Sequence, residues 1–189
     1  MRKIKIMEHI SLDGIMEQGE EYAYDNWTAA FRSPAGLEAV MEAHGNVFDL
    51  LLGRVTYDIW AGYWPHAGNI PIANGINTAT KYVATHRPES LEWGPVEDLG
   101  TDIVEGVRRI KATDGPDVIL WGSSTLTTIL LDQGLIDEVV LITYPVLLGK
   151  GKRIFSESFN ARELAFVNTK VTSTGVLINT FRHVGALKI

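Results

Sequence analysis

The sequence has no cysteine among its 189 residues. That absence excludes disulfide bridges, thiolate nucleophiles and cysteine-ligated zinc sites. Long hydrophobic runs are missing too, because no stretch approaches the roughly 18 apolar residues that a membrane-spanning helix needs. Near the basic N-terminus, Glu8, His9 and Asp13 interrupt the chain before the apolar core of a signal peptide can form. We therefore expect a cytoplasmic protein without a membrane partner.

Runs of positive charge are also lacking. The formal net charge is −6, and basic residues occur in scattered pairs such as Arg108–Arg109. A nucleic-acid partner is therefore not predicted. The five histidines show no H-E-x-x-H spacing or comparable ligand pattern, so no metal is predicted. The GKGKR segment at 149–153 lacks the spacing of a Walker A motif, which argues against nucleotide hydrolysis.

What the sequence does contain is an alternation of strand and helix patterns. At 46% hydrophobic residues the chain fits one compact domain over residues 1–189. Strand patterns occupy 3–10, 47–53, 81–85, 117–121 and 138–144. Helical patterns follow Ser33-Pro34, Thr101 and Ser123, and Thr101 is predicted to cap the helix that follows it. Residues 163–184 alternate around a Ser-Thr-Gly turn and predict an antiparallel hairpin. Together these patterns predict an α/β fold with a mostly parallel sheet flanked by helices and the hairpin at one edge.

Small, hydroxyl-bearing and cationic residues follow several of these strands. Ligands of such sheets bind beyond the carboxyl ends of the strands, and a glycine turn before a helix favours a phosphate. The relevant turns are Gly53–Thr56, Thr85–Arg87 and Gly122–Thr125. Two alternatives stay open: the hydroxyls could merely cap helices, and Arg54 and Arg87 could pair with surface carboxylates.

Several longer motifs resemble a known family. They are SLDG after the first strand, LLLGRVTYDIW followed by YWP, KYVAT, VILWGSSTL and LIDEVVLITYPVLLGKGKRIF. They are similar to the dihydrofolate reductase-like superfamily, in the branch related to the C-terminal reductase domain of the bifunctional riboflavin-biosynthesis deaminase-reductase (RibD C-terminal domain-like). The resemblance implies a three-layer fold with a central mixed sheet of about eight strands, bound NADPH and a homodimer.

The resemblance also assigns roles to individual residues. Leu12, Asp13 and Gly14 match the loop near the nicotinamide, and Asp13 is the candidate catalytic group, although an aspartate before a glycine is also typical of an ordinary turn. The positions that match cofactor-binding turns are Gly53, Arg54 and Thr56; Thr85, His86 and Arg87; and Gly122, Ser123, Ser124, Thr125 and Leu126.

Aromatic residues supply the candidate substrate pocket. Trp27 and Tyr57 are predicted to line it, whereas for Trp60 and Trp64, four residues apart on a predicted helix, core packing is favoured. Dihydrofolate reductases carry an acid a few residues after the corresponding tryptophan. Here no acid follows Trp27 before Glu38, which puts the usual folate chemistry in doubt. Asp25 and Glu38 are weaker candidates for acids that face a substrate.

The leading functional hypothesis is an NADPH-dependent reductase that transfers a hydride to a small pterin-, pyrimidine- or flavin-like substrate. The cofactor supplies the hydride, and the protein supplies geometry and at most one proton. Two alternatives stay open: a non-catalytic dinucleotide-binding protein and a homodimeric interaction protein on the same fold. The zinc signature of a deaminase domain is missing.

Overall fold

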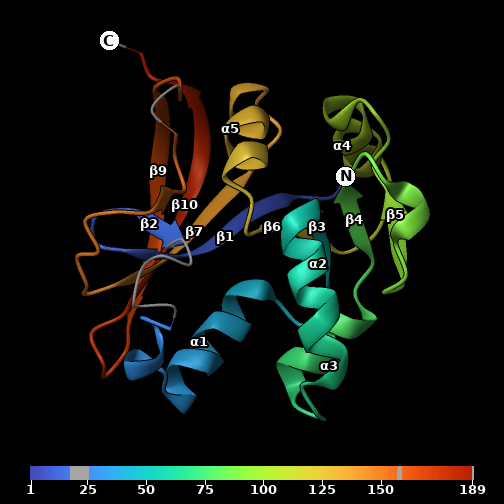
Figure 1. The fold of residues 1–189 in the computed structure, drawn as a ribbon. Helices are drawn as coiled ribbons and strands as arrows, with labels where there is room; N and C mark the ends of the chain where they lie inside the picture. Colours follow the sequence, from blue (N-terminus) through green and yellow to red (C-terminus); the bar gives the residue numbers. More distant parts are fainter. Residues whose placement is uncertain (18–25, 157–158, 189) are drawn as a thin grey trace.

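The fold is that of a computed structural model, which describes residues 1–17, 26–156 and 159–188 (Figure 1). Its central sheet has eight strands in the order β5-β4-β3-β6-β1-β7-β10-β9. These strands are β1 (Ile4–Ser11), β3 (Phe48–Gly53), β4 (Lys81–Ala84), β5 (Val96–Asp98), β6 (Asp117–Trp121), β7 (Glu138–Tyr144), β9 (Arg162–Val171) and β10 (Leu177–Ala186). The first six of them in chain order pair in parallel, and β10 pairs antiparallel with β7 and β9. The predicted mixed sheet with a C-terminal hairpin is confirmed.

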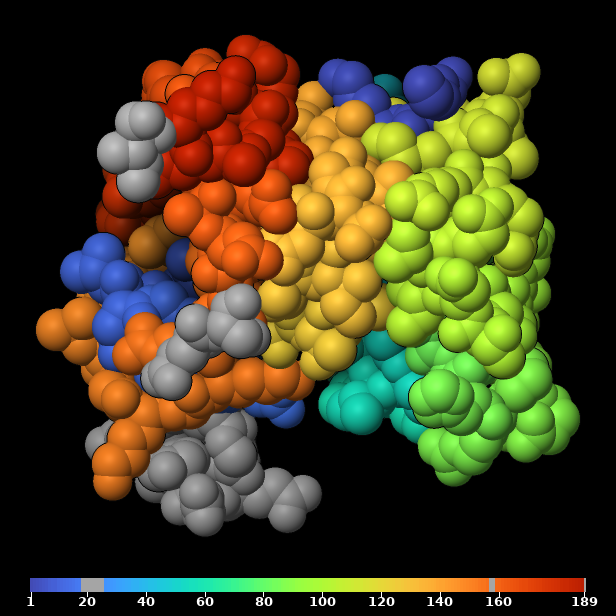
Figure 2. Space-filling model, turned by 90° about the horizontal axis from the view of Figure 1, so that it is seen from above, coloured from blue at the N-terminus to red at the C-terminus, as the bar shows by residue number. Residues whose placement is uncertain are grey.

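Helices cover both faces of this sheet. They are α1 (Pro34–His44), α2 (Arg54–Tyr63), α3 (Pro71–Thr78), α4 (Ile103–Ala112) and α5 (Ser124–Asp132), with short 3-10 turns η1 (Ala29–Phe31), η2 (Trp64–His66) and η3 (Pro88–Ser90). One core cluster joins Val107 of α4 and Leu130 of α5 to the sheet, and the other joins Val40 of α1, Tyr57 of α2 and Ile76 of α3 to its opposite face. The fold therefore has three layers (Figure 1). Viewed from above, α5 in gold lies between the red hairpin and the yellow-green α4 (Figure 2).

Local sequence explains most of these boundaries. Ser33 accepts the Gly36 N–H at 3.1 Å, and Pro34 occupies the first turn of α1, as the Ser-Pro pair predicts. The cap of α4 is Asp102, whose carboxylate accepts the Glu105 N–H at 3.0 Å, so the prediction of Thr101 was wrong by one residue. An aspartate at this position also suits the positive end of the helix dipole.

Among the described residues, two short strands form a second, smaller sheet. They are β2 (Ile15–Glu17) and β8 (Lys152–Arg153), which pair antiparallel. Gly151 has a φ of 139°, and a Cβ there would lie 2.5 Å from the Glu17 carbonyl oxygen. Only a glycine lets these two loops approach so closely.

Candidate functional site

Two helix N-termini meet at the carboxyl ends of β3 and β6. These strands are neighbours, with Leu52 opposite Trp121, and each runs directly into a helix. Because α2 and α5 cover opposite faces of the sheet, the chain leaves the two strands in opposite directions, as it does where ligands bind to such sheets. The first N–H groups of each helix have no acceptor within it, and both dipoles present positive charge here. The arrangement suits a phosphate or pyrophosphate group.

Glycine is required in both of these turns. Gly122 has a φ of 78°, and a Cβ there would lie 2.6 Å from Thr56 Oγ1. A Cβ at Gly53 would lie 2.9 Å from Ser123 Oγ. Thr56 in turn donates a hydrogen bond to the Gly122 carbonyl at 3.1 Å. The two turns are packed so closely that the sequence needs glycine in each of them.

The hydroxyl-bearing residues of the β6–α5 turn have different roles: one caps the helix, and two form its first turn. Ser123 Oγ accepts the Leu126 N–H at 3.4 Å, so this serine is the cap of α5. The Leu126 side chain is buried in the core, which leaves neither its N–H nor its side chain open to a ligand. Ser124 and Thr125 form the first turn of α5, where their N–H groups remain for an anion.

Arg54 is held by neighbours at the start of α2. Its Nε contacts the two carboxylate oxygens of Asp58 at 2.8 and 2.9 Å. Its Nη1 donates to Thr85 Oγ1, to the Arg87 carbonyl and to Ser90 Oγ at 3.3, 3.0 and 2.8 Å. The alternative of a carboxylate partner for Arg54 is thus realised in the structure, and the guanidinium ties the ends of β3 and β4 together.

A small pocket of about 260 Å3 opens beside this arginine. Its wall includes Arg54, Thr85, His86 and Arg87, and the turn at Gly100–Thr101 closes it. The Arg87 side chain is 63% exposed, and its nearest carboxylate is Asp58 at 3.8 Å. The cationic residues predicted at the ends of β3 and β4 therefore do converge. The part of the pocket wall that Gly100 and Thr101 form after β5 was not predicted.

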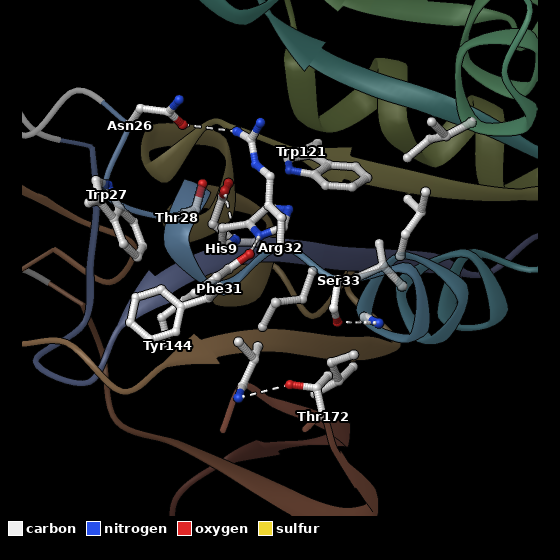
Figure 3. Close-up of a pocket in the computed structure, with 18 of the residues that line it drawn as sticks. His9, Asn26, Trp27, Thr28, Phe31, Arg32, Ser33, Trp121, Tyr144 and Thr172 are labelled. Atoms are coloured by element: carbon white, nitrogen blue, oxygen red, sulfur yellow. Dashed lines mark hydrogen bonds between the residues drawn. The ribbon is translucent and has the colours of Figure 1, made fainter. Parts of the chain in front are cut away.

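A larger pocket of about 820 Å3 lies on the other side of β6. Aromatic rings from several elements form much of its wall: Trp27, Phe31, Trp60, Trp64, Trp121 and Tyr144. The rings of Trp27 and Tyr144 meet edge to face with centroids 5.1 Å apart, and both are labelled in Figure 3. Flat aromatic walls of this kind suit a planar heterocycle.

The structure divides the aromatic candidates differently from the sequence. Trp27 lines the large pocket, whereas Tyr57 is buried in the core, where its hydroxyl accepts the Trp93 N–H at 2.7 Å. Tyr57 was therefore wrongly placed at the substrate. Trp60 and Trp64 pack against the core as predicted, and both also line the pocket. The helix ends between them at Tyr63, and Trp64 begins η2.

Asp13 anchors a turn. Its carboxylate accepts hydrogen bonds from Ser11 Oγ and from the N–H groups of Leu148 and Gly149, at 2.6, 3.1 and 2.7 Å. These bonds, led by that of Ser11, lower the pKa of Asp13 to about 2. An acid with such a pKa holds no proton at neutral pH, and Asp13 does not line the large pocket. Its contacts are those of the turn alternative, with Leu12 exposed and Gly14 at a φ of 80°.

The remaining acid candidates from the sequence are Glu38 and Asp25. Glu38 lies on the exposed side of α1 and is not part of the pocket wall, and Asp25 lies outside the described residues. Among residues 1–17, 26–156 and 159–188, no group of three potential ligands could hold a metal ion. In the same residues no helix is long and apolar enough to cross a membrane.

Two titratable residues on β1 do line the large pocket, and sequence reasoning missed both. Glu8 is 7% exposed, and its carboxylate accepts the N–H groups of Gly122 at 2.7 Å and His9 at 3.0 Å. Burial raises the pKa of Glu8 to about 7. His9 Nδ1 lies 2.8 Å from the Tyr144 hydroxyl, and its ring stacks on Trp121. Both residues lie within the apolar pattern of a strand, and no sequence motif identifies either of them as part of a site.

His9 and Tyr144 are both neutral near pH 7. Burial, followed by the positive charge of Arg32 and the proximity of His44, lowers the pKa of His9 to about 4. Burial raises the pKa of Tyr144 above its ordinary value. The pair therefore offers hydrogen-bonding groups to a ligand without a charge.

The chain is similar in sequence to two proteins of one bacterium. A protein of Bacillus subtilis (strain 168), YyaP, is 30% identical over 132 residues, which are 68% of this chain and 70% of that protein. A second protein of the same bacterium, YwjB, is 27% identical over 185 residues, which are 96% of this chain and 98% of that protein.

Solved structures share the fold at low sequence identity. A putative riboflavin biosynthesis protein from Shewanella sp. PV-4 has a TM-score of 0.68 at 20% identity, over 96% of this chain and 98% of that one. A dihydrofolate reductase from Enterococcus faecalis, complexed with NADP(H), has a TM-score of 0.62 at 16% identity, over 96% of both chains. A Thermotoga maritima deaminase and 5-amino-6-(5-phosphoribosylamino)uracil reductase has a TM-score of 0.65 at 17% identity, over 96% of this chain and 56% of that one.

The family itself is given by a sequence match over most of the chain. Residues 2–178 match the family described as the RibD C-terminal domain. The three-layer sheet and the resemblance seen in the sequence motifs agree with that match. The chain is thus a member of the RibD C-terminal domain family.

Proposed function

We propose that this protein is an NADPH-dependent reductase that transfers a hydride to a small, planar, pyrimidine-like heterocycle. The observation that carries the proposal is the junction of two sites at the end of β6: the phosphate-compatible turns at Gly53 and Gly122 on one side, and the aromatic pocket lined by Trp121 on the other. The fold neighbours include a reductase of an aminouracil and a dihydrofolate reductase that was complexed with NADP(H), which supports this chemistry.

The described residues fit the dinucleotide. The first turns of α2 and α5 would hold its pyrophosphate, with Ser124 and Thr125 as N–H donors. Arg87 and His86 line the small pocket and would face a 2′-phosphate. Bound there, the cofactor would supply a hydride. The protein contributes the wall of the large pocket, which excludes water and orients the substrate.

A titration with NADPH and NADH in parallel tests the cofactor, with quenching of tryptophan fluorescence as the signal. We expect tighter binding of NADPH, and a loss of roughly tenfold in NADPH affinity in Arg87→Ala, because a charged hydrogen bond is removed. NADH affinity should stay unchanged in that variant. Arg108→Ala, on an exposed part of α4, is the matched control. Equal binding of both nucleotides, or none, would contradict the proposal.

A non-catalytic dinucleotide-binding protein is the second candidate. It is favoured by the contacts of Asp13, whose carboxylate is engaged by a hydroxyl and two backbone N–H groups. This candidate predicts NADPH binding without turnover of any pterin, flavin or pyrimidine.

We further propose that the protein is a cytoplasmic homodimer. The hairpin exposes large apolar side chains near the free edge of the sheet, on β9, on β10 and just beyond it: Phe166, Val167, Val171, Val184 and Leu187. An unpaired edge strand with exposed apolar residues is a common site of association.

A further inference from the structure

We propose that Glu8 is the acid that donates a proton to the substrate, in the place of the acid that is missing after Trp27. The inference rests on the proposed reductase function. It starts from the position of Glu8, which lies at the junction between the phosphate-compatible turn and the aromatic pocket. Among the described residues of the pocket wall, Glu8 is the sole carboxylic acid.

The pairing of the strands explains why this position is open. β6 pairs with β1 as far as Trp121 opposite Met7, and the chain then turns away at Gly122. β1 continues beside β7 as far as Ser11. The edge of β1 that faced β6 is therefore without a strand partner from Glu8 onward. The Glu8 carboxyl bridges this gap through its hydrogen bond to the Gly122 N–H.

The surroundings of Glu8 allow it to exist in both protonation states. Burial disfavours the carboxylate, and the two N–H donors of Gly122 and His9 favour it, so the group titrates near neutral pH. Within the part of the chain that the structure describes, the charged groups that act on Glu8 are Glu17 and Lys152, which form an ion pair at 3.5 Å and shift its pKa in opposite directions. Their effects offset each other in part, and burial remains the main cause.

The other polar groups of the wall cannot take this role as readily. Arg32 is permanently charged and donates to Asn26 at 3.0 Å. His9 has a lowered pKa and carries no spare proton at pH 7. Tyr144 has a raised pKa, and its hydroxyl already contacts His9. They are suited to orient a substrate, which leaves Glu8, among the described titratable residues of this wall, as the group that exchanges a proton at neutral pH.

The proposed step is balanced in electrons and protons. A carbon of a C=N bond in the heterocycle accepts a hydride, which brings two electrons and one hydrogen from the reduced nicotinamide. The π electrons of that bond become a new N–H bond to the proton of Glu8. The carboxylate that remains is stabilised by the N–H groups of Gly122 and His9, and it regains a proton from water after product release.

The first test needs neither cofactor nor substrate. In protein labelled with 13C at the glutamate carboxyl carbons, NMR should show one resonance that titrates near pH 7. That resonance should disappear in Glu8→Gln, which keeps an oxygen acceptor for the Gly122 N–H, and should persist in Glu17→Gln, an exposed acid nearby. If Glu8→Gln does not fold, Glu8→Asp supplies the assignment by shifting the resonance. A glutamate spectrum without any titration near neutrality would overturn the inference.

The second test measures proton donation to a ring nitrogen without turnover. The probes are 2,4-diaminopyrimidine, which is basic, and uracil, which is neutral. At pH 8, Glu8→Gln should bind the basic probe at least tenfold more weakly, and uracil within twofold of the wild type. Ultraviolet difference spectra should show the basic probe bound as its cation. An equal loss of affinity for both probes would show that Glu8 has only a structural role, and it would overturn the inference. An unchanged affinity for the basic probe would overturn it as well.

The outcomes separate the two proposals. If the wild type does not bind NADPH, the proposed reductase function is contradicted, whereas the titration of the Glu8 carboxyl can still be observed. Normal NADPH binding in Glu8→Gln, together with a loss of about 100-fold in the rate of hydride transfer, is the result expected of a general acid. A change in NADPH affinity without a selective effect on the basic probe would contradict proton donation.

Discussion

At the scale of the residue, Glu8 couples the protonation of the pocket to the stability of the fold. Its pKa is raised from 4.5 in the unfolded chain to about 7 in the folded protein, so the folded state binds more protons between these values. The contribution of this group to stability is therefore present below pH 4.5 and is lost as the pH rises toward 7. His9 and His44, whose pKa values are lowered to about 4, act in the opposite direction over an overlapping range.

A comparison of Glu8→Gln with the wild type isolates this effect. The free energy of unfolding of the variant, relative to the wild type, should increase between pH 5 and pH 8, by about 2 kcal/mol as an order of magnitude. Urea denaturation at both pH values measures it. A difference that is independent of pH would show that Glu8 does not titrate in this range, because the histidine contributions cancel between the two proteins.

A second prediction at this scale concerns Gly122. Gly122→Ala should lose stability through both backbone strain and the clash with Thr56, and should bind NADPH at least roughly tenfold more weakly because the turn must shift. Gly134→Ala is a matched control, since Gly134 has a φ of 65° but open space around it. In the control, the free energy of unfolding should fall by about 1 kcal/mol, and the NADPH affinity should stay unchanged. Equal losses of stability and of NADPH affinity in the two variants would show that the close contact between Gly122 and Thr56 is not needed for cofactor binding.

At the scale of the element, α2 carries a cation that lines the small pocket and an anion that contacts two arginines of its wall. Asp58 lies one turn after Arg54 and also faces Arg87. Removing its charge in Asp58→Asn should raise NADPH affinity several-fold, more at low salt than at high salt, because a negative charge no longer opposes a phosphate there. Asparagine keeps an oxygen acceptor for Arg54.

The control for this prediction is Glu105→Gln, which removes an exposed acid that pairs with Arg108 on α4. NADPH titrations of both variants at low and at high salt measure the effect. A fall in NADPH affinity in Asp58→Asn would show instead that the carboxylate is needed to hold Arg54 in place.

The elements also differ in how well local sequence predicts them. The cap at Ser33-Pro34 and the alternating hairpin are local signals, and both were found. α3 and β5 were missed, because their signals are not local. α3 contains Gly75 and depends on burial of Ala73 and Ile76, and β5 has three residues and depends on pairing with β4.

The same distinction applies to the site. The turns at Gly53 and Gly122 were predicted because they combine glycine with the start of a helix, a pattern with a physical reason. Glu8, His9 and Tyr144 were missed, because a polar residue inside a strand pattern does not reveal which strand ends beside it. Tyr57 shows the converse: an aromatic residue near the right motif points into the core.

At the scale of the whole molecule, the exposed apolar side chains of the hairpin lead to a prediction about assembly. Phe166→Lys combined with Val171→Lys should convert a dimer into a monomer, because two exposed apolar groups near the sheet edge become charged. Light scattering after size exclusion measures the mass. Leu147→Lys, which changes a 73% exposed residue in the loop after β7, is the control and should leave the mass unchanged. A wild-type monomer would contradict the prediction at once.

The most direct measurement of the central claim follows the hydrogen itself. NADPH carrying deuterium at C4 of the nicotinamide, in each of its two stereochemical forms, is incubated with the protein and a panel of pyrimidine, pterin and flavin compounds, and the products are analysed by mass spectrometry. The account predicts that deuterium from one of the two forms appears on a carbon of one heterocycle. Tight NADPH binding with no deuterium transferred to any compound would contradict the reductase and favour the dinucleotide-binding protein.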